Sequence, residues 1–472
     1  MIAGPVPFLS SEVRFHGRQS GAELRKVWFA SALMDVAVAI LGVTSLFSVR
    51  LVGDLPIAEI LMLVLLPFLL AVRGRMIFRK ELLPIYGLCA LWLFAQILSD
   101  LSHGMTAPQQ WMRSYAAITF FSFDIMLMAA LTSGSTRRKL IFLGAFALSS
   151  LIRVRFFPLP VMVDEPWKFG YADGVINSTL LVSCFFYARR RNAVVVLLLF
   201  GLIAINLFEN FRSPLLFLFV VLAIVIPVIP ERIGNLQLLP RKGSALRVIS
   251  IVAFSLVAGL AARQVLTWAT EKGLSGEEGR EKNESQAVAG SGIQFLFSAR
   301  PEFPIAIMAV ADSPFLGHGS APNEPRYREM LNDMLDETGQ ESQLESDLEL
   351  MGGLIPVHSF LLQAWVSAGV LGSVIWFYLL ALCVKSIVRV AIVLPPTAPY
   401  LTFLFILFFW NIFFSPFGST ERLTVACTIL LMLDLSKSAQ PMPSLVDELH
   451  LSGWRRGRWT RQRSGRTLTL GS

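Results

Sequence analysis

The sequence has little charge, few cysteines and few histidines. Only 16% of its 472 residues are charged, whereas 54% are hydrophobic, and this balance excludes an ordinary soluble protein. The four cysteines, Cys89, Cys184, Cys383 and Cys427, all lie in apolar stretches, which excludes a disulfide framework and a CxxC metal site. No acidic metal motif adjoins an apolar stretch either. We therefore expect no metal ion and no cofactor.

Long apolar runs dominate the rest of the sequence. Repeated runs of about 18 residues or more are typical of membrane-spanning helices, and they are continuous, unlike the alternating strands of a transmembrane barrel. The sequence therefore predicts an all-α polytopic membrane protein with about 12 transmembrane helices. The predicted order is a polar segment over residues 1–26, nine spans over 27–268, one large loop with short helices over 269–357, three spans over 358–435 and a basic tail over 436–472.

The basic residues predict how the chain is oriented. Short loops on one side, such as those at residues 73–80, 137–139 and 189–191, are all basic, and such loops remain in the cytoplasm. We expect a bacterial inner-membrane protein with both termini cytoplasmic and the acidic 269–357 loop in the periplasm. The tail mixes tryptophan with arginine, which suits an anionic inner leaflet, and no fold signal supports nucleic-acid binding.

Three carboxylates, Asp35, Glu59 and Asp124, fall inside predicted spans. Ionisable groups at such depth usually face a cavity or a partner. They would line a groove for lipid phosphate only if an arginine such as Arg113 or Arg153 neutralised them. The simpler interpretation is structural pairing.

Arg212, Arg300 and His358 each precede a predicted helix on the outward side. A helix N-terminus attracts phosphate, and a guanidinium binds phosphate oxygens bidentately without losing its proton. A neutral imidazole beside them is able to accept a proton. These residues therefore suit a lipid-diphosphate site, with the alternatives that the arginines only reach for the membrane surface and that the histidine only caps a span.

Three short segments carry a family resemblance. They are Asn210-Phe211-Arg212-Ser213-Pro214, then Ser298-Ala299-Arg300-Pro301 through Pro314-Phe315-Leu316-Gly317-His318-Gly319, and Val357-His358-Ser359-Phe360 through Gly369-Val370-Leu371-Gly372. In this order around a late outward loop, they resemble the O-antigen ligase and O-antigen polymerase superfamily. The resemblance covers about residues 206–380.

The resemblance implies a metal-independent, inverting glycosyltransferase of multi-span, GT-C-like architecture. Arg212 and Arg300 would bind the diphosphate of an undecaprenyl-linked glycan, and His358 would act as general base or position the acceptor hydroxyl. Expected partners are this donor, a glycan or glycolipid acceptor, membrane lipids and a polysaccharide chain-length regulator. The product would be O-antigen, another part of lipopolysaccharide, or exopolysaccharide.

The sequence departs from the family pattern near the acceptor side. Ser359 follows the histidine where the family often has asparagine, and residues 365–368 lack the acidic residue often found before Gly-x-x-Gly. These departures slightly favour a polymerase over a ligase, and the choice stays open. We expect His318 to belong to a tight turn between Gly317 and Gly319 rather than to the site.

A transporter is the main alternative, in particular a flippase for lipid-linked oligosaccharides, because twelve spans also suit two six-span halves. Such carriers show paired repeats, and no matching halves are visible in this sequence. A scaffold protein that acts through its basic tail is a third possibility.

Overall fold

The computed structural model describes residues 21–50, 53–105, 108–225, 245–272, 300, 302–322, 324–338, 355 and 357–437. Its elements, in chain order, are α1 (Gly21–Thr44), β1 (Ser48–Arg50), β2 (Asp54–Pro56), α2 (Ile57–Ile77), α3 (Leu83–Ser102), α4 (Pro108–Thr132), α5 (Thr136–Phe156), α6 (Pro160–Asp164), the π-helix η1 (Pro166–Tyr171), α7 (Ala172–Ala188), α8 (Asn192–Phe208), α9 (Arg212–Val225), α10 (Ala245–Glu271), α13 (Glu302–Asp312), α14 (Pro325–Thr338), α16 (Phe360–Val393), α17 (Ala398–Phe414) and α18 (Arg422–Lys437). Strands β1 and β2 form one antiparallel hairpin. The prediction of an all-helical membrane protein is confirmed.

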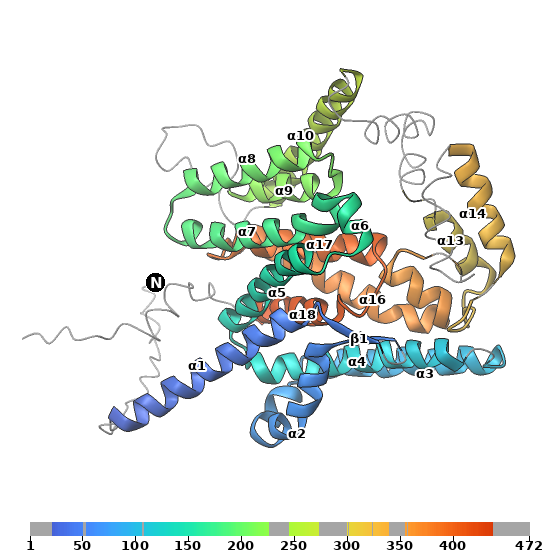
Figure 1. Ribbon diagram of the computed structural model, residues 1–472, viewed down its shortest axis with the longest axis horizontal. Coiled ribbons are helices and arrows are strands. Elements are labelled where there is room, and N and C mark those ends of the chain that lie inside the picture. The colour runs from blue at the N-terminus through green and yellow to red at the C-terminus, as the bar shows by residue number, and fades with distance from the viewer. Residues whose placement is uncertain are drawn as a thin grey trace, which may run out of the picture.

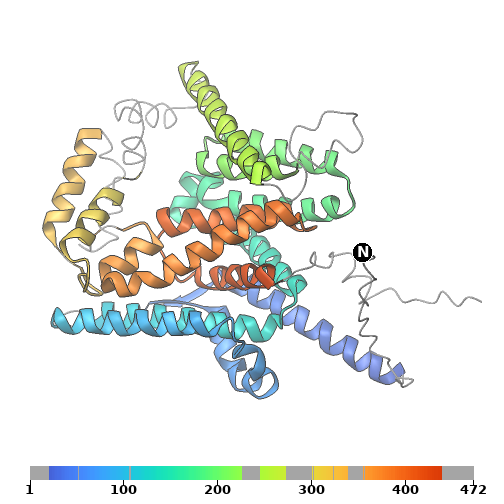
Figure 2. The same ribbon diagram turned by 180° about the vertical axis from the view of Figure 1, so that it is seen from behind.

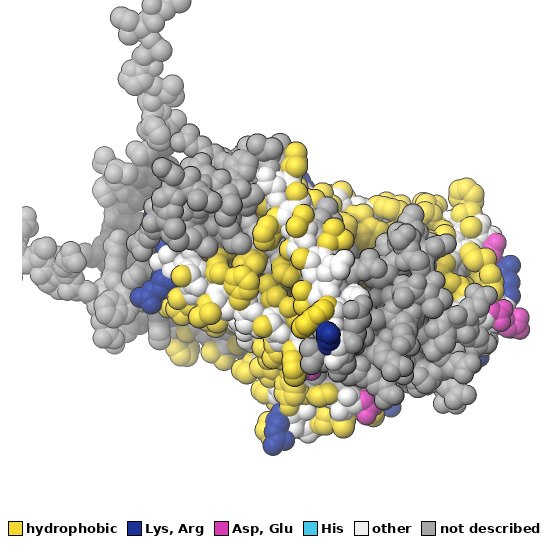
Figure 3. Space-filling view, turned by 90° about the horizontal axis from the view of Figure 1, so that it is seen from above, with side chains coloured by type: hydrophobic (Ala, Val, Ile, Leu, Met, Phe, Trp, Pro, Cys, Tyr) yellow, Lys and Arg dark blue, Asp and Glu magenta, His cyan; other side chains and the backbone are white. Residues whose placement is uncertain are grey.

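Five of these helices are long and apolar enough to cross a bilayer. They span Ile57–Ile77, Leu83–Ser102, Pro108–Thr132, Pro166–Ala188 and Phe360–Val393, and shorter apolar helices accompany them. Large apolar side chains remain on the outside, for example Val64, Leu197 and Phe208, and hydrophobic side chains cover much of the described surface in Figure 3. Such a surface is compatible with lipid. The count of twelve spans stays a prediction.

Helices α13 and α14 lie at the opposite end of the molecule from the start of α1 (Figures 1 and 2). They are helices of the predicted 269–357 loop, and α14 ends at Thr338. The first 20 residues, the stretches 273–299 and 339–354 of the acidic loop, and the basic tail over 438–472 lie outside the described residues.

The three carboxylates form ion pairs within the protein, in agreement with the simpler interpretation of structural pairing. Asp35 contacts Arg137 at 2.9 Å and Arg138 at 3.0 Å. Glu59 binds Arg422 through two hydrogen bonds of 2.9 and 2.8 Å, and Asp124 lies 3.9 Å from the same guanidinium. Arg422 therefore ties α2 and α4 to the start of α18, where losing one partner would leave a buried charge uncompensated.

The tenth span was predicted as one continuous helix, and the structure corrects this. Gly369 has φ 66° and ψ −168°, a conformation that is open essentially to glycine only. The rings of Phe360 and Trp376 lie 5.0 Å apart, although sixteen residues of straight helix would separate them by about 24 Å. A Cβ on Gly372 would lie 2.8 Å from the Ala364 carbonyl oxygen. The first two turns of α16 therefore fold back on the rest of the helix at Gly369.

Gly369→Ala is expected to destabilise the protein by about 3 kcal/mol or more, because alanine is strained at this φ and its Cβ would overlap the Phe315 carbonyl oxygen. The loss should appear as a lower thermal midpoint of the detergent-solubilised protein. Gly87→Ala in α3 is the matched control, since an added Cβ meets nothing within 4 Å there. An unchanged midpoint for Gly369→Ala would contradict the fold-back.

Candidate functional site

His358 lies directly before the fold-back helix and faces the first residue of α13. Its Nδ1 is 3.5 Å from Glu302 Oε1, and both side chains are partly exposed, at 25% and 18%. Sequence reasoning did not identify Glu302. The signal was its position two residues after Arg300, at the start of the helix that the sequence predicted.

Ser359 fixes this end of α16. Its hydroxyl accepts a hydrogen bond from the Leu362 N–H (3.0 Å) and donates one to the Ile412 carbonyl oxygen (2.8 Å). Ser359 therefore caps α16 and attaches its first turn to the last turn of α17. This contact holds the backbone next to His358 in place.

Arg300 lies two residues before Glu302 in the sequence. Its carbonyl oxygen accepts a hydrogen bond from the Phe303 N–H (3.0 Å), so the chain turns into α13 directly after it. The Phe303 ring packs 5.7 Å from that of Phe414, at the C-terminal end of α17. Among the residues that the structure describes, no carboxylate lies within ion-pair distance of the Arg300 guanidinium.

Arg212 opens α9 as predicted, with Pro214 in the first turn. Its Nε donates to Asn210 Oδ1 (3.0 Å), and Asn210 itself has a left-handed φ of 50°. One and a half turns further along α9, the Phe217 ring contacts that of Trp410, at 5.7 Å, and Trp410 contacts Phe414, at 4.4 Å.

The C-terminal half of α17 is therefore a common neighbour of α9, of α13 and of the start of α16. Ser359 reaches it at Ile412, Phe303 reaches it at Phe414, and Phe217 reaches it at Trp410. The structure brings the surroundings of Arg212, Arg300 and His358 to one helix, although the segments are far apart in the sequence.

A cavity of about 70 Å³ adjoins this part of α17. Its lining includes Asp173 and Asn177 of α7, Asn411 of α17 and Thr424 of α18. Glu421 lies at the start of α18, and burial raises the pKa of its carboxyl.

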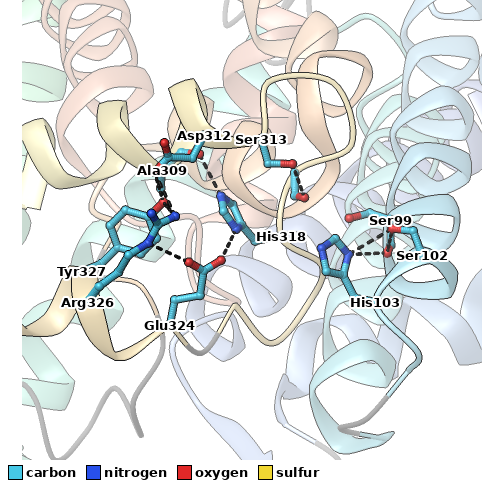
Figure 4. Close-up of polar contacts among 11 residues, drawn as sticks. Ser99, Ser102, His103, Ala309, Asp312, Ser313, His318, Glu324, Arg326 and Tyr327 are labelled. Atoms are coloured by element: carbon cyan, nitrogen blue, oxygen red, sulfur yellow. Dashed lines mark hydrogen bonds and ion pairs between the residues drawn. The ribbon is translucent and has the colours of Figure 1, made fainter.

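His318 belongs to a tight turn between two glycines, as the sequence predicted. Gly317 and Gly319 have φ of 71° and 80°. As Figure 4 shows, His318 Nδ1 contacts Glu324 Oε1 (2.6 Å) and its Nε2 contacts the Ala309 carbonyl oxygen (2.8 Å). Both ring nitrogens therefore have partners within the turn, and the ring is occupied in holding the loop.

A second, smaller cavity of about 30 Å³ lies beside this turn. Its lining includes Asp100, His103 and Trp111. His103 Nδ1 lies 2.8 Å from the Ser99 carbonyl oxygen, at the end of α3 (Figure 4). This cavity is separate from the His358 pair.

Comparison with known proteins adds no identification, since neither any protein-family model nor any curated protein matches the chain. Among the described residues, no group of three or more metal-ligating side chains is present. The class that the structure defines is a helical membrane protein with a histidine–carboxylate pair.

Proposed function

We propose that this protein is a membrane glycosyltransferase that moves a glycan from undecaprenyl diphosphate to an acceptor hydroxyl at the periplasmic side of the bacterial inner membrane. The proposal includes twelve spans, a GT-C-like architecture, cytoplasmic termini and inversion at the anomeric carbon without a metal ion. The observation that carries it is the convergence of the three segments on α17. A donor diphosphate could contact both arginines only if such segments meet.

The chemistry needs cations on one side of the anomeric carbon and a base on the other. Negative charge grows on the diphosphate as its bond to the sugar breaks, so fixed guanidinium groups stabilise the transition state more than the ground state. His358 accepts the proton of the attacking hydroxyl. Helix α9 starts at Arg212 and α13 starts two residues after Arg300, so two helix N-termini add partial positive charge.

Purified protein with an undecaprenyl-diphosphate glycan and an acceptor tests the proposal. A new glycosidic bond, absent without protein, is the expected result. Movement of the donor across a vesicle membrane without bond formation would instead identify a flippase.

A deletion strain separates the two acceptor classes. Single repeats on the terminal lipid would indicate a lost polymerase, which the departures near the acceptor side favour. Carrier-linked polymer that is never transferred would indicate a lost ligase.

A further inference from the structure

Glu302 carries an unexplained feature. Its Oε1 lies 3.5 Å from His358 Nδ1, while its Oε2 is shielded from solvent and has no hydrogen-bond partner among the described residues. A shielded carboxylate oxygen is costly unless a water, an ion or a ligand supplies a hydrogen-bond donor.

Rigid elements hold both members of the pair. Glu302 occupies the first position of α13, where the helix dipole favours a negative charge, and its neighbour Phe303 packs on Phe414. On the other side, Ser359 fixes the backbone next to His358 through its contacts with Leu362 and Ile412. The carboxylate and the imidazole therefore face each other before any substrate binds, as a positioned catalytic pair must.

We propose that Glu302 positions His358 as the general base for the acceptor hydroxyl. This inference rests on the proposed glycosyltransferase function. With Nδ1–H directed at Glu302, the other ring nitrogen, Nε2, is the proton acceptor. The unit resembles the histidine–carboxylate arrangement of hydrolytic triads, in which the carboxylate orients the imidazole and stays ionised.

The proton and electron movements balance without a further reactant. The acceptor hydroxyl gives its proton to His358 Nε2 as its oxygen forms the new bond to the anomeric carbon. The bond between that carbon and the phosphate oxygen breaks, and its electron pair leaves with undecaprenyl diphosphate. The imidazolium then returns the proton to the diphosphate or to water, while Glu302 keeps its negative charge throughout.

Glu302→Gln tests the inference, because the amide keeps the size of the side chain and loses the charge. We expect kcat to fall about 10- to 100-fold, while KM for the donor changes less than about threefold, since uniform donor binding is retained. Glu302→Asp keeps the charge one methylene further back and should recover part of kcat. If Glu302→Gln does not fold, Glu302→Asp tests the inference in its place. A wild-type kcat for Glu302→Asp would then overturn the inference.

Asp312→Asn is the matched control at the other end of α13, where the carboxylate pairs with Arg326 at 3.0 Å. It should retain kcat within about twofold, because it does not reach the reacting atoms. Wild-type kcat for Glu302→Gln with a lowered thermal midpoint would show a purely structural ion pair and overturn the inference. Failure of the wild-type protein to form any glycosidic bond would instead overturn the proposed function.

Discussion

Replacing His358 by alanine should lower kcat about 10²- to 10⁴-fold, the usual contribution of a general base. The acceptor hydroxyl is a weak nucleophile unless a base removes its proton during attack. His358 is next to Ser359, which contacts α17. The other described histidines, His103 and His318, lie at the separate smaller cavity and cannot substitute for it. The rate of glycosidic bond formation with saturating donor and acceptor measures this loss.

His103→Ala is the matched control for this experiment. It removes an exposed histidine at the end of α3, whose Nδ1 is held by the Ser99 carbonyl oxygen. Its kcat should stay within about twofold of the wild type. Full activity of the His358 variant, with bond formation established for the wild type, would remove the histidine from the mechanism.

The class of fold could be predicted because long apolar runs are a local property of the sequence. Helix starts were also predictable, since Arg212-Ser213-Pro214 and Arg300-Pro301 carry their own boundary signals, and α9 and α13 begin at or next to them. The fold-back at Gly369 was not predictable. A glycine in an apolar run is compatible with a straight helix, and only the packing of the Phe315 backbone against it requires the left-handed conformation.

The sequence predicted individual residues of the candidate site but not the contacts between them. Arg212, Arg300 and His358 could be chosen by residue type and position. Glu302 lies two residues after Arg300, but its position alone did not distinguish it from the other carboxylates of the acidic loop. Its role depends on a contact with a residue 56 positions later in the sequence. The same reason explains why the sequence did not identify Arg422 as the partner of Glu59, because the two residues are 363 positions apart.

Replacing Arg212 or Arg300 by lysine should lower kcat/KM about 10²- to 10³-fold. This is the size of effect seen when an enzyme loses one hydrogen-bond donor to the transition state. Lysine keeps the charge, so long-range attraction of the donor survives. It cannot offer two parallel N–H groups to phosphate oxygens. At Arg212 it would also lose the Nε hydrogen bond to Asn210 that orients the guanidinium plane.

Arg155→Lys is the control for this series, because Arg155 is an exposed arginine at the end of α5 that lies over the Phe156 ring. It should stay within about twofold of the wild type. A rise in KM alone for Arg212→Lys and Arg300→Lys would mean that the arginines only attract the donor. Wild-type kcat/KM in both would end their assignment to the diphosphate, because a group that binds the leaving phosphate must respond when its bidentate geometry is lost.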